Sequence, residues 1–127
     1  MPQHDMQECI DNCLACYRSC QETAMNHCLE KGGKFVEPEH FRLMLSCAEI
    51  CRTSADFMLS GSPLHAQTCA VCAGVCEACA ESCERLGEMD ECARICRVCA
   101  DSCREMAGAI HLMSGQQTTG TVARPTM

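Results

Sequence analysis

The sequence predicts an all-α fold, an antiparallel up-down four-helix bundle with a cysteine-lined core. Two observations carry this prediction. Sixteen of the 127 residues are cysteine, and most of them recur at alternating spacings of four and three residues, which is the spacing of core positions in packed helices. Glycine and proline also divide the chain into four segments with this rhythm, as expected of residues that end and begin helices.

Glycine and proline residues mark the ends of the four predicted helices. Gly32 ends the first helix, Pro38 opens the second, and Gly61 ends it. Pro63 stands in the first turn of the third helix, where a proline removes no hydrogen bond, and Gly87 ends that helix. Because the connections are short, consecutive helices are expected to be antiparallel neighbours. The expected helices cover, approximately, residues 2–31, 38–60, 63–86 and 89–114.

The chain is long enough for one domain, with the bundle at residues 1–114 and a polar, flexible C-terminal tail at 115–127. The net charge of −7 provides no basic surface for nucleic acid. No apolar run is long enough to span a membrane. The N-terminus lacks the basic and apolar regions of a secretory leader, so the expected compartment is the cytoplasm, where thiols stay reduced.

Cysteine is expected to form the core because other core residues are scarce. Leu, Ile, Val and Phe number 20, about 16 % of the chain, and with this net charge such a composition is typical of disordered proteins. A buried thiol, however, behaves as a small hydrophobe. Cysteines on the inner faces of four helices can therefore replace the missing aliphatic side chains.

Cysteines also stand four residues apart within the predicted helices, close enough for two thiolates to reach one metal ion. The seven such pairs are Cys9/Cys13, Cys16/Cys20, Cys47/Cys51, Cys72/Cys76, Cys79/Cys83, Cys92/Cys96 and Cys99/Cys103. Cys69 extends the stripe of the third helix. Cys28 lies off the stripe of the first helix and is included as the sixteenth candidate ligand.

Ligand type and charge together favour Cu(I), with multiple ions per chain. Thiolates select Cu(I), zinc or iron–sulfur clusters. Zinc takes four ligands, and four thiolates around one divalent ion leave a net charge of −2 that is costly to bury. One Cu(I) per thiolate is neutral, which suggests a capacity of roughly a dozen ions or more. No arrangement of catalytic residues stands out, so the chain is not expected to be an enzyme.

Other uses of many cysteines fit the spacing less well. A disulfide framework is typical of small secreted chains, and iron–sulfur and zinc-finger motifs have different spacings. The alternative kept open is a thiol/disulfide redox reservoir or sensor. A sensor needs exposed cysteines of low pKa, whereas these stripes face the bundle axis.

Methionine and histidine gather near both ends of the predicted bundle, where weak soft ligands could pass Cu(I) to the thiolates. At the first end the candidate uptake ligands are Met58, His65, Met106, His111 and Met113, with Met6 close by. A less favoured set at the second end is Met25, His27, His40, Met44 and Met89. Methionine at helical spacing is more often core filler, and a single histidine is more often satisfied by hydrogen bonds.

Four helices with Cys-x-x-x-Cys pairs on their inner faces resemble the bacterial copper storage proteins, over residues 5–113. The resemblance implies a homotetramer that binds many Cu(I) ions through core cysteines, with a copper chaperone as a candidate partner. Without a visible leader, the chain is similar to the cytosolic branch of the family. The second helix departs from the pattern, because it has only Cys47 and Cys51, with Ser54 at the next inward position.

Overall fold

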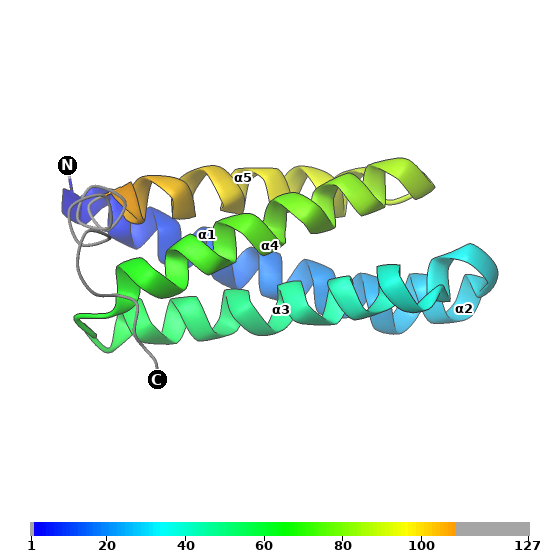
Figure 1. The fold of residues 1–127 in the computed structure, drawn as a ribbon, viewed down its shortest axis with the longest axis horizontal. Coiled ribbons are helices and arrows are strands. Elements are labelled where there is room, and N and C mark those ends of the chain that lie inside the picture. Colours follow the sequence, from blue (N-terminus) through cyan, green and yellow to red (C-terminus); the bar gives the residue numbers. More distant parts are fainter. Residues whose placement is uncertain (1, 109–127) are drawn as a thin grey trace, which may run out of the picture.

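The structure, a computed structural model, describes residues 2–108 as a bundle of four long antiparallel helical segments (Figure 1). The elements are α1 (Pro2–Glu22), the π-helix η1 (Thr23–Cys28), α2 (Leu29–Lys31), the 3-10 helix η2 (Gly33–Val36), α3 (Pro38–Leu59), α4 (His65–Leu86) and α5 (Asp90–Met106). Because α1, η1 and α2 follow without a break, they form one segment of the bundle. The predicted fold class is confirmed. The expected helix end at 114 and the tail at 115–127 lie outside the described residues.

Each long helix packs against two others. Helices α1 and α4 both contact α3 and α5, so α1 and α4 lie diagonally across the bundle. Every cysteine side chain is at most 3 % exposed, which confirms that cysteines point into the core. Buried alanines such as Ala48, Ala55, Ala80 and Ala100 stand beside them. None of the helices between residues 2 and 108 is long and apolar enough to cross a membrane.

Helix α4 begins at His65, two residues later than the sequence suggests. Residues 62–64 form a turn in which the Leu64 N–H donates to Ser62 Oγ at 3.1 Å, and the His65 N–H donates to the Ser62 carbonyl at 3.2 Å. Ser62 therefore satisfies the first free N–H groups from a turn outside the helix. Pro38, in contrast, occupies the first turn of α3 as expected.

The first segment contains a π-helix that the sequence does not predict. In a continuous α-helix, Cys28 would point about 80° away from Cys20. In η1 the Leu29 N–H donates to the Ala24 carbonyl, five residues back, so each residue turns the chain by less. Cys20, Ala24 and Cys28 are consequently all fully buried, and Cys28 joins the interior.

Candidate metal centre

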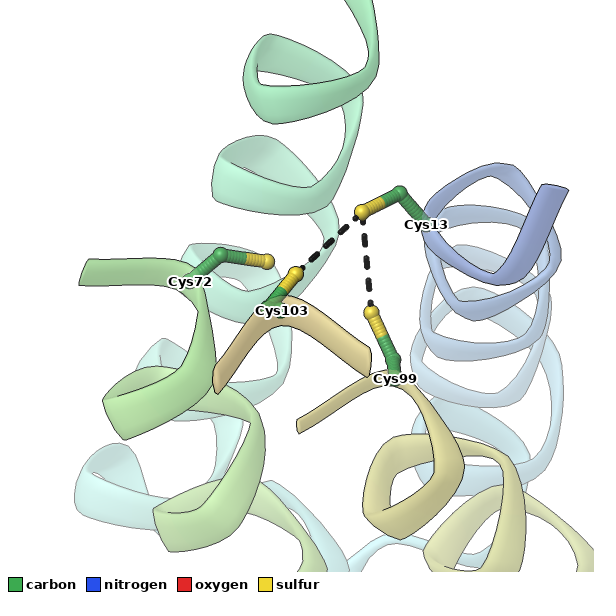
Figure 2. A group of neighbouring side chains, drawn as sticks. All are labelled: Cys13, Cys72, Cys99 and Cys103. Carbon is green, nitrogen blue, oxygen red and sulfur yellow. Dashed lines mark hydrogen bonds between the residues drawn. The ribbon is translucent and has the colours of Figure 1, made fainter. Parts of the chain in front are cut away.

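The cysteine sulfurs form clusters along the bundle axis that are suited to hold metal ions. Figure 2 shows one of them, to which Cys13 of α1, Cys72 of α4, and Cys99 and Cys103 of α5 contribute. The sulfur atoms of each cluster lie within 4.8 Å of one another. The four clusters are Cys9/Cys69/Cys103, Cys13/Cys72/Cys99/Cys103, Cys16/Cys51/Cys76/Cys99 and Cys16/Cys20/Cys47/Cys96.

Neighbouring clusters share a cysteine, which makes the sulfurs one continuous column. Cys103 belongs to the first two clusters, Cys99 to the second and third, and Cys16 to the third and fourth. The column continues from Cys20 to Cys92, whose sulfurs lie 3.8 Å apart. An ion can therefore move along the column by exchanging one thiolate at a time.

The closest sulfur contacts join different helices rather than positions four apart in one helix. The Cys51 and Cys76 sulfurs lie 3.4 Å apart, between α3 and α4. Within a helix, the Cys16 and Cys20 sulfurs are 4.0 Å apart and those of Cys72 and Cys76 are 3.8 Å apart. Six of the seven predicted pairs thus contribute at least one sulfur to clusters that several helices build together, whereas Cys79/Cys83 belongs to none of the four.

At the second end of the bundle, thioethers and an imidazole extend the column. Met44 Sδ lies 3.5 Å from the sulfurs of both Cys79 and Cys83. Cys28 Sγ lies 3.7 Å from Met89 Sδ and 3.7 Å from His40 Nε2. Of the other candidates at this end, Met25 is 36 % exposed, and His27 Nε2 lies 3.5 Å from Glu88 Oε1.

At the first end, the structure places the described uptake candidates unequally. Met58 is buried, with its sulfur 3.8 Å from Cys69 Sγ. Ser54 Oγ also lies 3.3 Å from Cys69 Sγ. His65 is half-buried, and its Nδ1 lies 2.9 Å from the Ser62 carbonyl oxygen. Met6 and Met106 are half-buried against the core; His111 and Met113 lie outside the described residues.

One polar residue of the interior was missed by the sequence interpretation. Ser82 is 6 % exposed, and its Oγ lies 2.7 Å from His40 Nδ1. The contact joins α4 to α3 and depends on how the two helices are aligned along the axis. No sequence signal marks it, since Ser82 falls beside the stripe of Cys79 and Cys83 rather than in it.

Burial keeps several core thiols protonated. Burial raises the pKa of Cys28 to about 11, with further contributions from the charges of Cys92 and Cys79. The pKa of Cys69 also rises to about 11. The contact with Cys103 lowers this pKa, but the contact with Cys9 and the burial of the thiol together raise it by more. Burial lowers the pKa of His40, so that its ring is neutral. A metal ion that binds these thiols must displace their protons.

The metal-free protein is expected to lose stability as the pH rises above about 9. The pKa of Cys28 and of Cys69 rises from 9.0 to about 11 on folding. Such a thiol contributes its full stabilisation at pH values below its pKa in the unfolded chain. This stabilisation is lost as the pH rises to its pKa in the folded chain. Each of the two contributes on the order of 1–3 kcal/mol. Urea unfolding under anaerobic, reducing conditions at pH 7 and pH 10 measures the loss, and an equal midpoint at both pH values would contradict it.

Comparison with known proteins identifies the family. The profile of the copper storage proteins matches residues 2–108, which are all of the residues that the structure describes. The chain belongs to the copper storage protein family. It is also 35 % identical, over 77 residues, to the uncharacterized cysteine-rich protein YhjQ of Bacillus subtilis (strain 168), in an alignment that covers 61 % of this chain and 70 % of that protein.

Solved structures of similar proteins share the fold. A protein of Nitrosospira multiformis is 57 % identical, with a TM-score of 0.83 over 84 % of this chain and 98 % of that one. The Cu(I)-bound copper storage protein BsCsp3 is 33 % identical, with a TM-score of 0.76 over 81 % and 98 % of the two chains. The metal-free form of Csp3 from Bacillus subtilis is 34 % identical, with a TM-score of 0.72 over 80 % and 97 %.

Family and geometry together confirm the predicted function. The chain is a copper storage protein that binds Cu(I) through its core cysteines. Proteins of this family store metal rather than catalyse a reaction, so the chain is not an enzyme. The charge argument that selected Cu(I) over zinc from the sequence therefore reached the right metal.

Proposed function

We propose that all sixteen core cysteines are Cu(I) ligands, and that one chain stores roughly a dozen ions or more. The observation that carries this proposal is the continuous, buried column of sulfur. The buried polar residues in the described chain are His40, Ser54 and Ser82, with no carboxylate or ammonium among them. Ions whose charge the thiolates balance one to one can therefore fill the column without leaving charge in the core.

The spacing of the sulfurs supports shared ligands. Two ligands of one ion, each at about 2.0–2.3 Å, lie roughly 3.5–4 Å apart. The sulfur contacts in the column cover this range, from 3.4 Å for Cys51 and Cys76 to 4.0 Å for Cys16 and Cys20. The metal-free arrangement therefore needs only small side-chain movements to bind the ions.

Copper enters, in this proposal, at the first end of the bundle through Met58, His65 and Met106; the candidates His111 and Met113 lie outside the described residues. Support comes from Met58, whose sulfur already contacts Cys69 of the terminal cluster. His65 adds a half-buried ring whose Nδ1 is held by the Ser62 carbonyl, which directs the other nitrogen away from that contact. Neutral ligands at this end would release Cu(I) readily to the thiolates below them.

We place this storage in the cytoplasm, as buffering of copper supplied by a chaperone. All sixteen cysteines are free, and a reducing compartment preserves free thiols. We also infer a homotetramer, as the family resemblance implies. A groove between α4 and α5, lined by small residues that include Ala70, Gly74 and Ala107, supports close packing of a second chain.

The redox alternative has less support. A sensor needs thiols that oxidants can reach, whereas all sixteen cysteines are buried. The column also extends to methionine sulfurs at both ends, and a thioether cannot form a disulfide. Storage of a soft ion uses both kinds of sulfur.

An anaerobic titration with Cu(I) against a chromophoric chelator tests the proposed function. We expect the full chain to take roughly a dozen ions or more before the chelator competes for added copper. A matched titration with Zn(II) should saturate at far fewer ions, since four thiolates per zinc leave the core charged. Tight binding of only one or two Cu(I) ions per chain would refute storage.

A further inference from the structure

Asn26, inside the π-helix η1, makes a hydrogen bond from its side chain to the helix backbone. Its amide donates from Nδ2 to the carbonyl oxygen of Glu22 at 2.9 Å. In an α-helix, the carbonyl four residues back accepts from the backbone N–H. A side chain that inserts into this ladder of hydrogen bonds is one of the few causes of a local irregularity in a helix. The Asn26 amide is inserted where η1 replaces the α-helix.

The π-helix decides the direction in which Cys28 points. Cys20, Ala24 and Cys28 are all fully buried. If the α-helix continued through this segment, Cys28 would lie about 80° from Cys20 around the helix axis, and within about 20° of Tyr17 and Gln21. Both of these side chains are half-buried. The π-helix therefore moves one thiol from the rim of the core to its interior.

The chain that follows η1 can accommodate either conformation. Only the short helix α2 (Leu29–Lys31) remains before Gly32, and Gly32 and Gly33 both have positive φ angles. Glycine adopts such angles readily, so a return to α-helix would rotate α2 and be absorbed in the turn. Local interactions at η1 therefore select between the two conformations.

We propose that Asn26 is a positioning residue, whose bond to the Glu22 carbonyl holds η1 in the π conformation and thereby keeps Cys28 among the core thiols. Asparagine suits this role, because its side chain competes with the hydrogen bonds of the α-helix backbone. Asn26 itself is exposed on the outside of the bundle. The consequence for storage rests on the proposed function: all sixteen thiols face the column only while η1 persists.

The competing interpretation is that burial of Cys28 alone shapes the segment, with the Asn26 bond incidental. The two differ in what happens to Cys28 when the amide is removed. Asn26→Ala removes the donor and introduces the strongest helix former. Asn26→Ser keeps a hydroxyl that can bond the carbonyl one turn back. Gln7→Ala is the matched control, because it removes an exposed amide that donates to the Asp11 side chain in α1.

The test is anaerobic alkylation of the metal-free full chain by iodoacetamide, followed by mass spectrometry. Trypsin cleaves after Arg18 and Lys31, so Cys20 and Cys28 share one peptide, and its fragments report the two thiols separately. The alkylation rate follows the population of the conformation that exposes a thiol. We expect Asn26→Ala to raise the rate at Cys28 roughly tenfold, from the lost hydrogen bond and the gain in α-helix propensity. The rate at Cys20 should stay unchanged.

The controls separate positioning from a general loss of stability. Asn26→Ser and Gln7→Ala should both keep the wild-type rates at Cys20 and Cys28. Unfolding of the whole bundle exposes both thiols, so equal acceleration at the two would overturn the proposal. An unchanged rate at Cys28 in Asn26→Ala would overturn it as well. Alanine at an exposed helix position does not endanger folding, which circular dichroism checks.

Alkylation of the metal-free chain involves no copper, so the result stands apart from the proposed function. A wild-type chain that takes up only one or two Cu(I) ions would refute storage and leave the positioning of Cys28 as measured. Conversely, a chain that takes up a dozen ions while Asn26→Ala leaves Cys28 protected would keep the store and remove only the role of Asn26.

Discussion

Cys16→Ala is expected to lower the copper capacity by about two ions, whereas the matched variant Cys47→Ala lowers it by about one. Cys16 belongs to two of the four clusters and Cys47 to one. The Cys16 sulfur contacts thiols of all three other long helices, with Cys47, Cys76 and Cys96 at 3.9, 3.9 and 3.7 Å. Its loss therefore removes a shared ligand from the middle of the column. Competition titrations of both variants measure the difference.

Stability provides the control for this comparison. Both cysteines are fully buried, and each substitution removes one sulfur atom from the core. We expect a similar cost for both, about 1 kcal/mol in the metal-free state, measured by urea unfolding under reducing conditions. If the two variants are equally stable and lose the same number of ions, Cys16 is not a ligand shared by two clusters.

The inward positions of the cysteines were predictable from one sequence because they follow from helix geometry alone. Residues such as Cys47 and Cys51, or Cys72 and Cys76, keep the alternating spacing of core positions, and no other regular structure fits it. Burial of the thiols then follows, since the sequence offers few aliphatic side chains to take their place. The metal followed from charge, because only a monovalent ion balances so many buried thiolates.

The pairing of cysteines between helices was not predictable in the same way. The 3.4 Å contact between Cys51 and Cys76 depends on the axial alignment of α3 and α4 and on side-chain rotamers. Spacing within a helix holds no information on either. The sequence interpretation therefore found the buried cysteines that build the clusters, but grouped them in pairs along single helices.

Cys28 shows a second limit of sequence analysis. Its position was judged against an ideal α-helix, and the π-helix η1 changes the direction in which it points. No residue between Thr23 and Cys28 is a glycine or proline that would mark the irregularity. The gain from burying the thiol beside His40 and Met89 is a tertiary effect, which local propensity cannot reveal.

Loading with Cu(I) is expected to raise the unfolding temperature of the chain by tens of degrees. A ligand present at 100 times its Kd and bound only by the folded state adds about 2.7 kcal/mol per site. A dozen such sites would exceed the whole stability of a typical domain, which is about 5–15 kcal/mol. Thiols of the unfolded chain also bind Cu(I) and reduce this gain, but they lack the sulfurs that other helices contribute to each cluster. Anaerobic thermal unfolding, followed by circular dichroism at increasing copper, measures the effect.

The metal-free state supplies the decisive control for this prediction. We expect it to stay helical, since the thiols are themselves buried apolar groups that pack with alanines such as Ala48 and Ala80. A chain that is unfolded without copper would show that the metal, rather than cysteine packing, forms the core. A loaded chain that melts at the same temperature as the metal-free one would show that the unfolded thiols bind copper as well as the folded column does. Only a folded metal-free bundle that copper strongly stabilises is consistent with a preformed column into which the ions are inserted.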